Sequence, residues 1–169
     1  MTRILWDVDT QVDFMEPSGK LYVPGARDIA PAMERLVDAA RAARVTHVAS
    51  ADDHELTDPE ISDDPDFRNT FPAHCLRGTR GAEKILETKQ RDPLLDALDP
   101  EEIVVFGVAT DVCDDAAIRG FLARGRRVVF VEDAARGLDA ERTAAALEAW
   151  RAAGVAFASA DEAIASFTR

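Results

Sequence analysis

The sequence predicts an α/β fold, in which about five to six strands form a doubly wound parallel sheet with helices on both faces. The first observation is that short, continuous apolar runs alternate with longer helical segments, as in parallel sheets that are covered on both sides. The second is that carboxylate, imidazole and thiol side chains follow these runs, where such sheets bind ligands. The 169 residues are expected to form a single domain, 1–169.

Apolar runs identify the strands. Residues 4–8 read Ile-Leu-Trp-Asp-Val and residues 103–106 read Ile-Val-Val-Phe, and both are typical of buried strands. Ala116, Ala117 and Ile118 mark the first apolar positions of a helix after the second of these runs. The expected strands are 4–9, 45–50, 102–107, 126–131 and 154–157. The expected helices are 26–44, 80–87 (a helix or a turn), 92–98, 113–124, 139–153 and 160–167.

Composition excludes several classes of protein. The net charge of −12 argues against a nucleic-acid partner, and no run approaches the ~18 apolar residues of a membrane span. The first residues lead into a strand rather than a signal peptide, and two cysteines in unlike contexts do not suggest a disulfide framework. We therefore expect a cytoplasmic protein with a small-molecule substrate, and we expect it to be a homo-oligomer.

Cys113 is the first candidate for chemistry. It lies where the strand 102–107 passes into a helix, and a helix N-terminus favours a thiolate, the nucleophilic form of cysteine. Alone, the segment fits a small buried side chain equally well. At the end of the first strand, Asp9 is either a functional carboxylate or the cap of a turn. Asp7, inside that strand, needs a partner if it is buried.

A metal site is the second candidate. Asp52 and His54 follow the strand 45–50, and His74 comes twenty residues later. Together they offer one oxygen and two nitrogen ligands to a divalent metal, although two histidines that flank a surface loop would give the same pattern. Cys75 is either a further ligand or a packing residue, and we favour packing. The polar segment 52–68 is expected to be a loop that folds over the site.

Lysine is rare in this chain, with Lys20, Lys84 and Lys89 as its only examples. Lys89 follows an apolar segment and is a candidate for a catalytic ammonium, although a solvated side chain fits as well.

Four motifs occur in an order that resembles the isochorismatase-like cysteine hydrolases, and within them the nicotinamidases. They are DTQVDF (9–14), DxH (52–54), FPAHC (71–75) and GVATDVC (107–113). The segments 19–26 and 120–133 also resemble this family, so that the resemblance covers nearly the whole chain.

The resemblance implies an α/β isochorismatase-like fold and hydrolysis of a small carboxamide, such as nicotinamide, to an acid and ammonia. It implies the following site. The catalytic triad is Asp9, Lys89 and Cys113, with Lys84 as the second choice of lysine. The oxyanion hole is formed by the N–H groups of Ala109 and Cys113, after a cis peptide bond between Val108 and Ala109, and the substrate lies between Phe14 and Phe71. A divalent metal is bound by Asp52, His54 and His74, with zinc as the first choice and iron or manganese as alternatives.

The chain departs from the family pattern after the DxH pair, between His74 and Cys113, and directly after Cys113, where Asp114 and Asp115 stand in place of an apolar residue. A further histidine after the DxH pair is absent, so that water or Glu60 would complete the metal shell. The interval from His74 to Cys113 is short, and the missing length falls near the expected lysine. Two alternatives therefore stay open: a hydrolase of another amide, carbamoyl compound or ureide, and a non-catalytic scaffold protein.

Overall fold

The computed structural model describes residues 3–86, 88 and 100–167, so that Lys89 and the expected helix 92–98 lie outside the described residues. Five strands form one sheet, and every pairing is parallel. In the order β2-β1-β3-β4-β5, these strands are β2 (Thr46–Ala49), β1 (Arg3–Val8), β3 (Glu102–Val108), β4 (Arg127–Arg136) and β5 (Ala156–Ala158). The predicted fold class and parallel sheet are confirmed.

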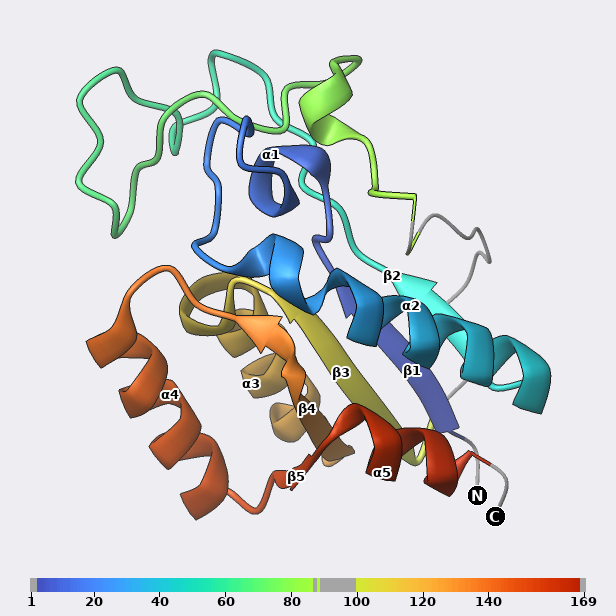
Figure 1. Cartoon of the computed structure of the whole chain (residues 1–169). Coiled ribbons are helices and arrows are strands. Elements are labelled where there is room, and N and C mark those ends of the chain that lie inside the picture. The colour runs from blue at the N-terminus through green and yellow to red at the C-terminus, as the bar shows by residue number, and fades with distance from the viewer. Residues whose placement is uncertain (1–2, 87, 89–99, 168–169) are drawn as a thin grey trace.

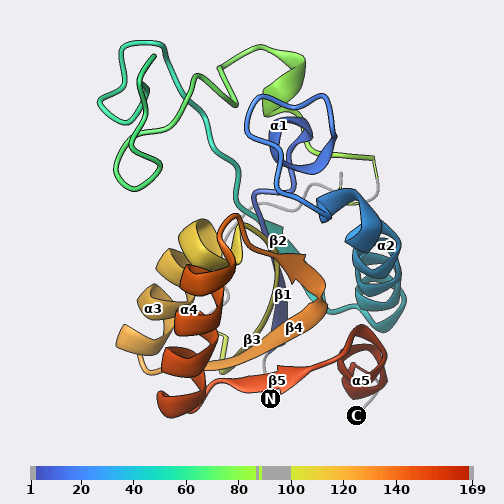
Figure 2. The ribbon, with the colours of Figure 1, turned by 60° about the vertical axis from the view of Figure 1, so that its left-hand side comes forward.

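Helices cover both faces of the sheet (Figure 2). One face carries α2 (Ala26–Ala43) and α5 (Ala160–Ser166), and the other carries α3 (Asp115–Ala123) and α4 (Ala140–Ala152). Each face has its own apolar core, with Met33 and Leu36 of α2 in the first, and Ile118 of α3 and Trp150 of α4 in the second. None of the described helices is both long enough and apolar enough to cross a membrane.

The strand order reverses direction beside β1, because β2 lies on one side of it and β3 on the other. Ligands of open parallel sheets bind beyond the carboxyl ends of the strands at such a point. Figure 1 shows α1 (Val12–Met15) and the long loop 50–79 gathered at this end of the sheet. Gly107 pairs with Val8 across the end of β1 and β3, and a Cβ on this glycine would collide with the Val8 carbonyl oxygen.

Three elements differ from those expected. The one-turn helix α1 was not predicted, because four residues are too few to show a helical period. β4 continues five residues past the predicted end at 131, because the polar residues Glu132 and Asp133 end the apolar run without ending the strand. The expected helix 113–124 is a π-helical turn, η2 (Thr110–Asp114), followed by α3. In the described part of the segment 80–87, where a helix or a turn was expected, the structure has the short 3₁₀ turn η1 (Arg80–Ala82).

Candidate active site

Asp9 and Cys113 lie together beyond the ends of the neighbouring strands β1 and β3. Asp9 has a positive φ of 46° where the chain leaves β1, and the Ser50 hydroxyl donates a hydrogen bond of 2.7 Å to its Oδ1. Cys113 lies in η2, directly before α3. A carboxylate oxygen of Asp9, one of Asp52 and the Sγ atom of Cys113 all lie within 4.8 Å of one another.

Burial sets the protonation of this pair. It raises the pKa of Asp9, and the nearby charge of Asp52 raises it further. Burial also raises the pKa of the Cys113 thiol well above its ordinary value, with the Asp9 carboxylate as the second cause. Both shifts favour the protonated forms, and they place two groups that can exchange a proton beside one another.

The backbone before Cys113 has the expected form. The Val108–Ala109 peptide bond is cis, which confirms this part of the expectation. The Ala109 carbonyl oxygen accepts hydrogen bonds from the N–H groups of Val112 at 3.0 Å and Asp114 at 3.1 Å. The turn thus folds back on Ala109, and Ala109 and Cys113 border the same cavity.

The three expected metal ligands converge. Asp52 Oδ2 lies 3.5 Å from His54 Nε2 and 3.5 Å from His74 Nε2. The Nδ1 atom of His74 donates to the Pro72 carbonyl oxygen at 2.7 Å, and Nε2 is the ring nitrogen that faces Asp52. Burial alone would raise the pKa of Asp52, but its hydrogen bonds to both histidines and their charges lower it below the usual value. An acceptor-rich N₂O set of this kind suits zinc, iron or manganese.

The second nitrogen of His54 also has acidic neighbours. His54 Nδ1 lies 3.4 Å from Asp58 Oδ2 and 3.3 Å from Glu60 Oε1. Carboxylates at this position orient a metal-binding imidazole and fix its tautomer. Glu60 therefore contacts the far side of the His54 ring rather than completing the group formed by Asp52, His54 and His74.

The side chain of Gln11 joins the segments that contain Asp52 and Ala82. Gln11 belongs to the DTQVDF motif, but the sequence did not predict this role. Its Nε2 donates to the carbonyl oxygens of Asp52 at 2.8 Å and Ala82 at 2.9 Å, while its Oε1 accepts the Asp52 N–H at 2.7 Å. Asp13 does the same for the next motif, because its Oδ2 accepts the Cys75 N–H at 2.8 Å. Cys75 itself is fully buried in the core, which agrees with a packing role.

A cavity of about 120 Å³ connects the metal-ligand group with Cys113. Phe14 and Phe71 flank His74, with ring centroids 5.3 Å and 6.1 Å from its ring, and both aromatic rings line the cavity. The remaining lining residues are Leu21, Asp52, His54, Glu60, Ala109, Val112 and Leu138. The space is small and mostly apolar, and it suits one planar ring.

Lys84 lies at this end of the sheet. It forms an antiparallel bridge with Gln11, and its Nζ lies 3.2 Å from Asp7 Oδ1 and 3.3 Å from Thr10 Oγ1. Its positive charge lowers the pKa of Asp9 against the larger effect of burial. Lys89, the first choice from the sequence, lies outside the described residues.

Asp111 and Arg142 form a connection that sequence reasoning missed. Asp111, in η2, accepts the Leu138 N–H at 2.7 Å, and its Oδ2 lies 3.1 Å from Arg142 Nη2. Arg142 Nη1 donates in turn to the Phe67 carbonyl oxygen at 2.7 Å. The turn that carries Cys113, the loop before α4 and the loop 50–79 are thus joined through two side chains.

Asp114 is a fully buried carboxyl next to Cys113, and among the described residues its only hydrogen-bonding neighbour is the Thr110 side chain, which lowers its pKa slightly against the effect of burial but makes no well-aligned hydrogen bond to it. Burial raises its pKa well above the ordinary value, and the charge of Asp9 adds to this effect. The folded protein therefore retains a proton on Asp114 at a pH where the unfolded chain has released it.

Asp114→Asn is expected to stabilise the protein at neutral pH. For a carboxyl with a raised pKa, its contribution to stability is complete below the unfolded pKa of about 4 and is lost as the pH rises through the folded pKa. The asparagine variant does not lose this stability as the pH rises. Its melting temperature should therefore exceed that of the parent by a few degrees at pH 7.5 and match it near pH 4. A variant less stable than the parent at pH 7.5 would show that the carboxylate has a stabilising partner.

The chain is similar to several known proteins. A family model described as "Isochorismatase domain" matches residues 85–162. The nicotinamidase/pyrazinamidase of Mycobacterium tuberculosis is 31% identical over 183 aligned positions, which cover 90% of this chain and 96% of that protein. The pyrazinamidase of Pyrococcus horikoshii, solved in complex with zinc, has a TM-score of 0.78 at 24% identity and covers 94% of this chain and 99% of its own. An isochorismatase family protein from Desulfovibrio vulgaris has a TM-score of 0.83 at 20% identity, with 99% of both chains covered.

Proposed function

Because the chain belongs to the isochorismatase family and is a hydrolase that acts on amide bonds, we propose that it hydrolyses a small planar carboxamide of the nicotinamide type to a carboxylic acid and ammonia. The observation that carries this proposal is the single small cavity that joins Cys113, two aromatic rings and the group formed by Asp52, His54 and His74. A planar ring between Phe14 and Phe71 would present its carboxamide to the thiol.

The first half of the reaction forms a thioester. Asp9 accepts the Cys113 proton, and the sulfur attacks the amide carbon to form a C–S bond. The N–H groups of Ala109 and Cys113 stabilise the negative oxygen of the tetrahedral intermediate. Asp9 then returns the proton to the amide nitrogen, the C–N bond breaks, and ammonia leaves. The raised pKa of Asp9 supports this role, because a proton carrier works best when its pKa is near the working pH.

The second half releases the acid. Asp9 takes a proton from water, the hydroxide adds to the thioester carbon, the C–S bond breaks, and Asp9 returns the proton to the Cys113 sulfur. We assign the catalytic ammonium to Lys84, since its charge favours the ionised form of Asp9. Lys89 is the alternative.

Asp52, His54 and His74 would hold the divalent metal, with zinc as the first choice. The bound ion would supply a positive centre that binds and orients the ring or a water beside it, which contributes to rate by positioning. The zinc in the structure of the Pyrococcus horikoshii pyrazinamidase supports this choice.

Gently purified protein is expected to contain about one metal ion per chain. His54→Ala and His74→Ala should each lose most of it, because each removes one of three ligand side chains. His47→Gln is the matched control, since His47 is the remaining histidine of the chain and lies outside this group. Elemental analysis measures all four proteins. Equal metal content in the two alanine variants and the parent would place the site elsewhere.

An ammonia-release assay over nicotinamide, pyrazinamide, carbamoyl compounds and ureides tests the proposed substrate class. We expect the aromatic carboxamides to react fastest, because the cavity is flanked by aromatic rings. Turnover of a ureide, without turnover of the aromatic carboxamides, would show that the chain belongs with the hydrolases of other amides. The short interval between His74 and Cys113 is the observation that favours this alternative.

A further inference from the structure

Asp7 is a buried carboxyl group that the chemistry above does not use. It lies in the central strand β1, paired with Ala49 of β2 and Phe106 of β3, and its side chain is 0% exposed. An ionised carboxylate at such a position is strongly destabilising unless it has a cation and hydrogen-bond donors beside it.

Lys84 and Thr10 supply these partners. Lys84 Nζ lies 3.2 Å from Asp7 Oδ1, and the Thr10 hydroxyl donates to Asp7 Oδ2 at 3.0 Å. The same hydroxyl lies 3.3 Å from Lys84 Nζ and 2.5 Å from the Thr88 hydroxyl. His47 Nε2 lies 3.8 Å from Asp7 Oδ2. The lysine side chain is only 14% exposed, so its ammonium has little water around it and depends on these contacts.

The backbone of Lys84 is fixed separately. The N–H of Val12 donates to the Glu83 carbonyl oxygen at 2.8 Å, and the N–H of Ile85 donates to the Thr10 carbonyl oxygen at 3.0 Å. These bonds place the lysine backbone alongside the segment that follows Asp9. They do not fix its four-carbon side chain, which loses rotamer entropy when it is held in one conformation. Among the described residues, the charged partner that holds its end is Asp7, and the Thr10 hydroxyl is the second contact.

We propose that Asp7 is a positioning residue, which holds the Lys84 ammonium where its charge acts on Asp9. The inference rests on the proposed function, in which Lys84 is the catalytic ammonium. Asp7 does not touch the substrate. It acts through Lys84, because its carboxyl oxygen lies 3.2 Å from the lysine Nζ and holds the end of that side chain in place.

Asp7→Asn tests the proposal, because it removes the charge and keeps the shape. Loss of one charge-assisted hydrogen bond to the lysine is expected to lower kcat by roughly tenfold or more, while KM stays within about twofold because the substrate contacts are intact. Asp7→Glu should recover part of kcat. Trace acetylation at fixed pH, read by mass spectrometry, should label Lys84 faster in Asp7→Asn, with the exposed Lys20 as the internal reference.

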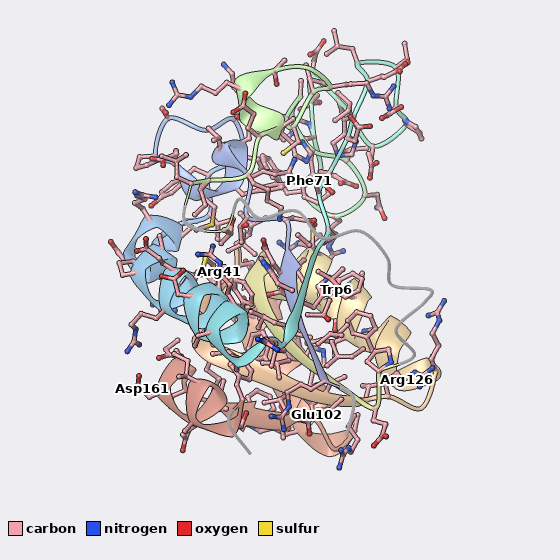
Figure 3. All side chains as sticks on the ribbon, turned by 90° about the vertical axis from the view of Figure 1, so that its right-hand side faces the viewer. Trp6, Arg41, Phe71, Glu102, Arg126 and Asp161 are labelled. Carbon is pink, nitrogen blue, oxygen red and sulfur yellow. The ribbon has the colours of Figure 1, made fainter. Side chains whose placement is uncertain are left out.

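Glu102→Gln is the matched control. Glu102 forms an ion pair with Arg3 at the amino end of β1 and β3, and Figure 3 shows it at the opposite end of the molecule from Phe71. Like Asp7→Asn, the Glu102→Gln change removes a carboxylate that pairs with a cation. Here, however, kcat and the labelling of Lys84 should not change. If Asp7→Asn does not fold, Thr10→Val removes the other contact of the ammonium and should give the same loss of kcat.

The outcomes separate this proposal from the proposed function. A normal kcat in Asp7→Asn overturns the positioning role, whatever happens to the labelling of Lys84. If the parent releases ammonia from none of the amides, the proposed function fails, and alkylation of Cys113 by iodoacetamide replaces kcat as the readout. Slower alkylation in Asp7→Asn then supports the positioning role, and an unchanged rate overturns it.

Discussion

Replacing Cys113 with alanine is expected to abolish amide hydrolysis, with kcat reduced by more than about 10³-fold, because no thioester can form without the sulfur. The protein should still fold, since Cys113 borders the cavity and alanine removes only one atom from its wall. Ammonia release measures kcat, and a melting curve checks the fold. No other group of the site can take over the role of the thiol.

Cys75→Ala is the matched control for this experiment. Cys75 is fully buried, and its Sγ contacts the Gly81 carbonyl oxygen at 3.9 Å. Burial raises the pKa of its thiol far above the usual range, so that it reacts slowly. The control should lose some stability through the small cavity it creates, yet keep most of its activity. Equal losses of kcat in the two variants would remove Cys113 from the role of nucleophile.

Lys84→Met should have the second-largest effect. Methionine keeps the length and apolar stem of the side chain but removes the charge that favours the ionised form of Asp9. The pKa of Asp9, already raised by burial, should rise further, so that the acidic limb of the kcat/KM profile moves to higher pH. We expect a loss of kcat/KM of about 10²-fold or more, as for other groups in proton transfer. Steady-state kinetics between pH 5 and 9 measure both quantities.

Lys20→Met and Lys89→Met complete the comparison, since these are the other two lysines of the chain. Lys20→Met should leave the profile unchanged, because Lys20 is exposed. If Lys89→Met moves the acidic limb and Lys84→Met does not, Lys89 supplies the ammonium. If neither change moves it, Asp9 works without a lysine.

The sequence was sufficient to predict the sheet and the positions of most candidate residues. Asp9, Asp52 and Cys113 each follow an apolar run, and the carboxyl ends of parallel strands meet at one edge, so that their proximity follows from local patterns. His74 is different, because it reaches the site through a loop. The bridge between His54 and Leu76 brings it there, and no local pattern in the sequence predicts such a bridge.

The choice of lysine could not be made from local patterns. Lys84 owes its position to backbone pairing with Gln11, a contact between segments 73 residues apart in sequence, and no periodicity predicts such a bridge. The burial of Asp7 and Asp114 has the same origin. Both residues are polar in sequence, yet the strands and helices packed around them leave each with no exposed surface, and this is a property of the assembled core.

The connection from Asp111 through Arg142 to Phe67 has a consequence for how this enzyme can diverge. Arg142 binds the main-chain oxygen of Phe67 rather than its side chain, and every amino acid supplies that oxygen. Point substitutions in the loop that carries Phe71 can therefore alter the cavity and leave the anchor intact. An insertion or deletion on either side of residue 67 would shift the oxygen away from the guanidinium. We expect new substrate preferences to arise in this lineage by replacement of loop side chains at constant loop length, and chimaeras that exchange the loop to work only when its length is preserved.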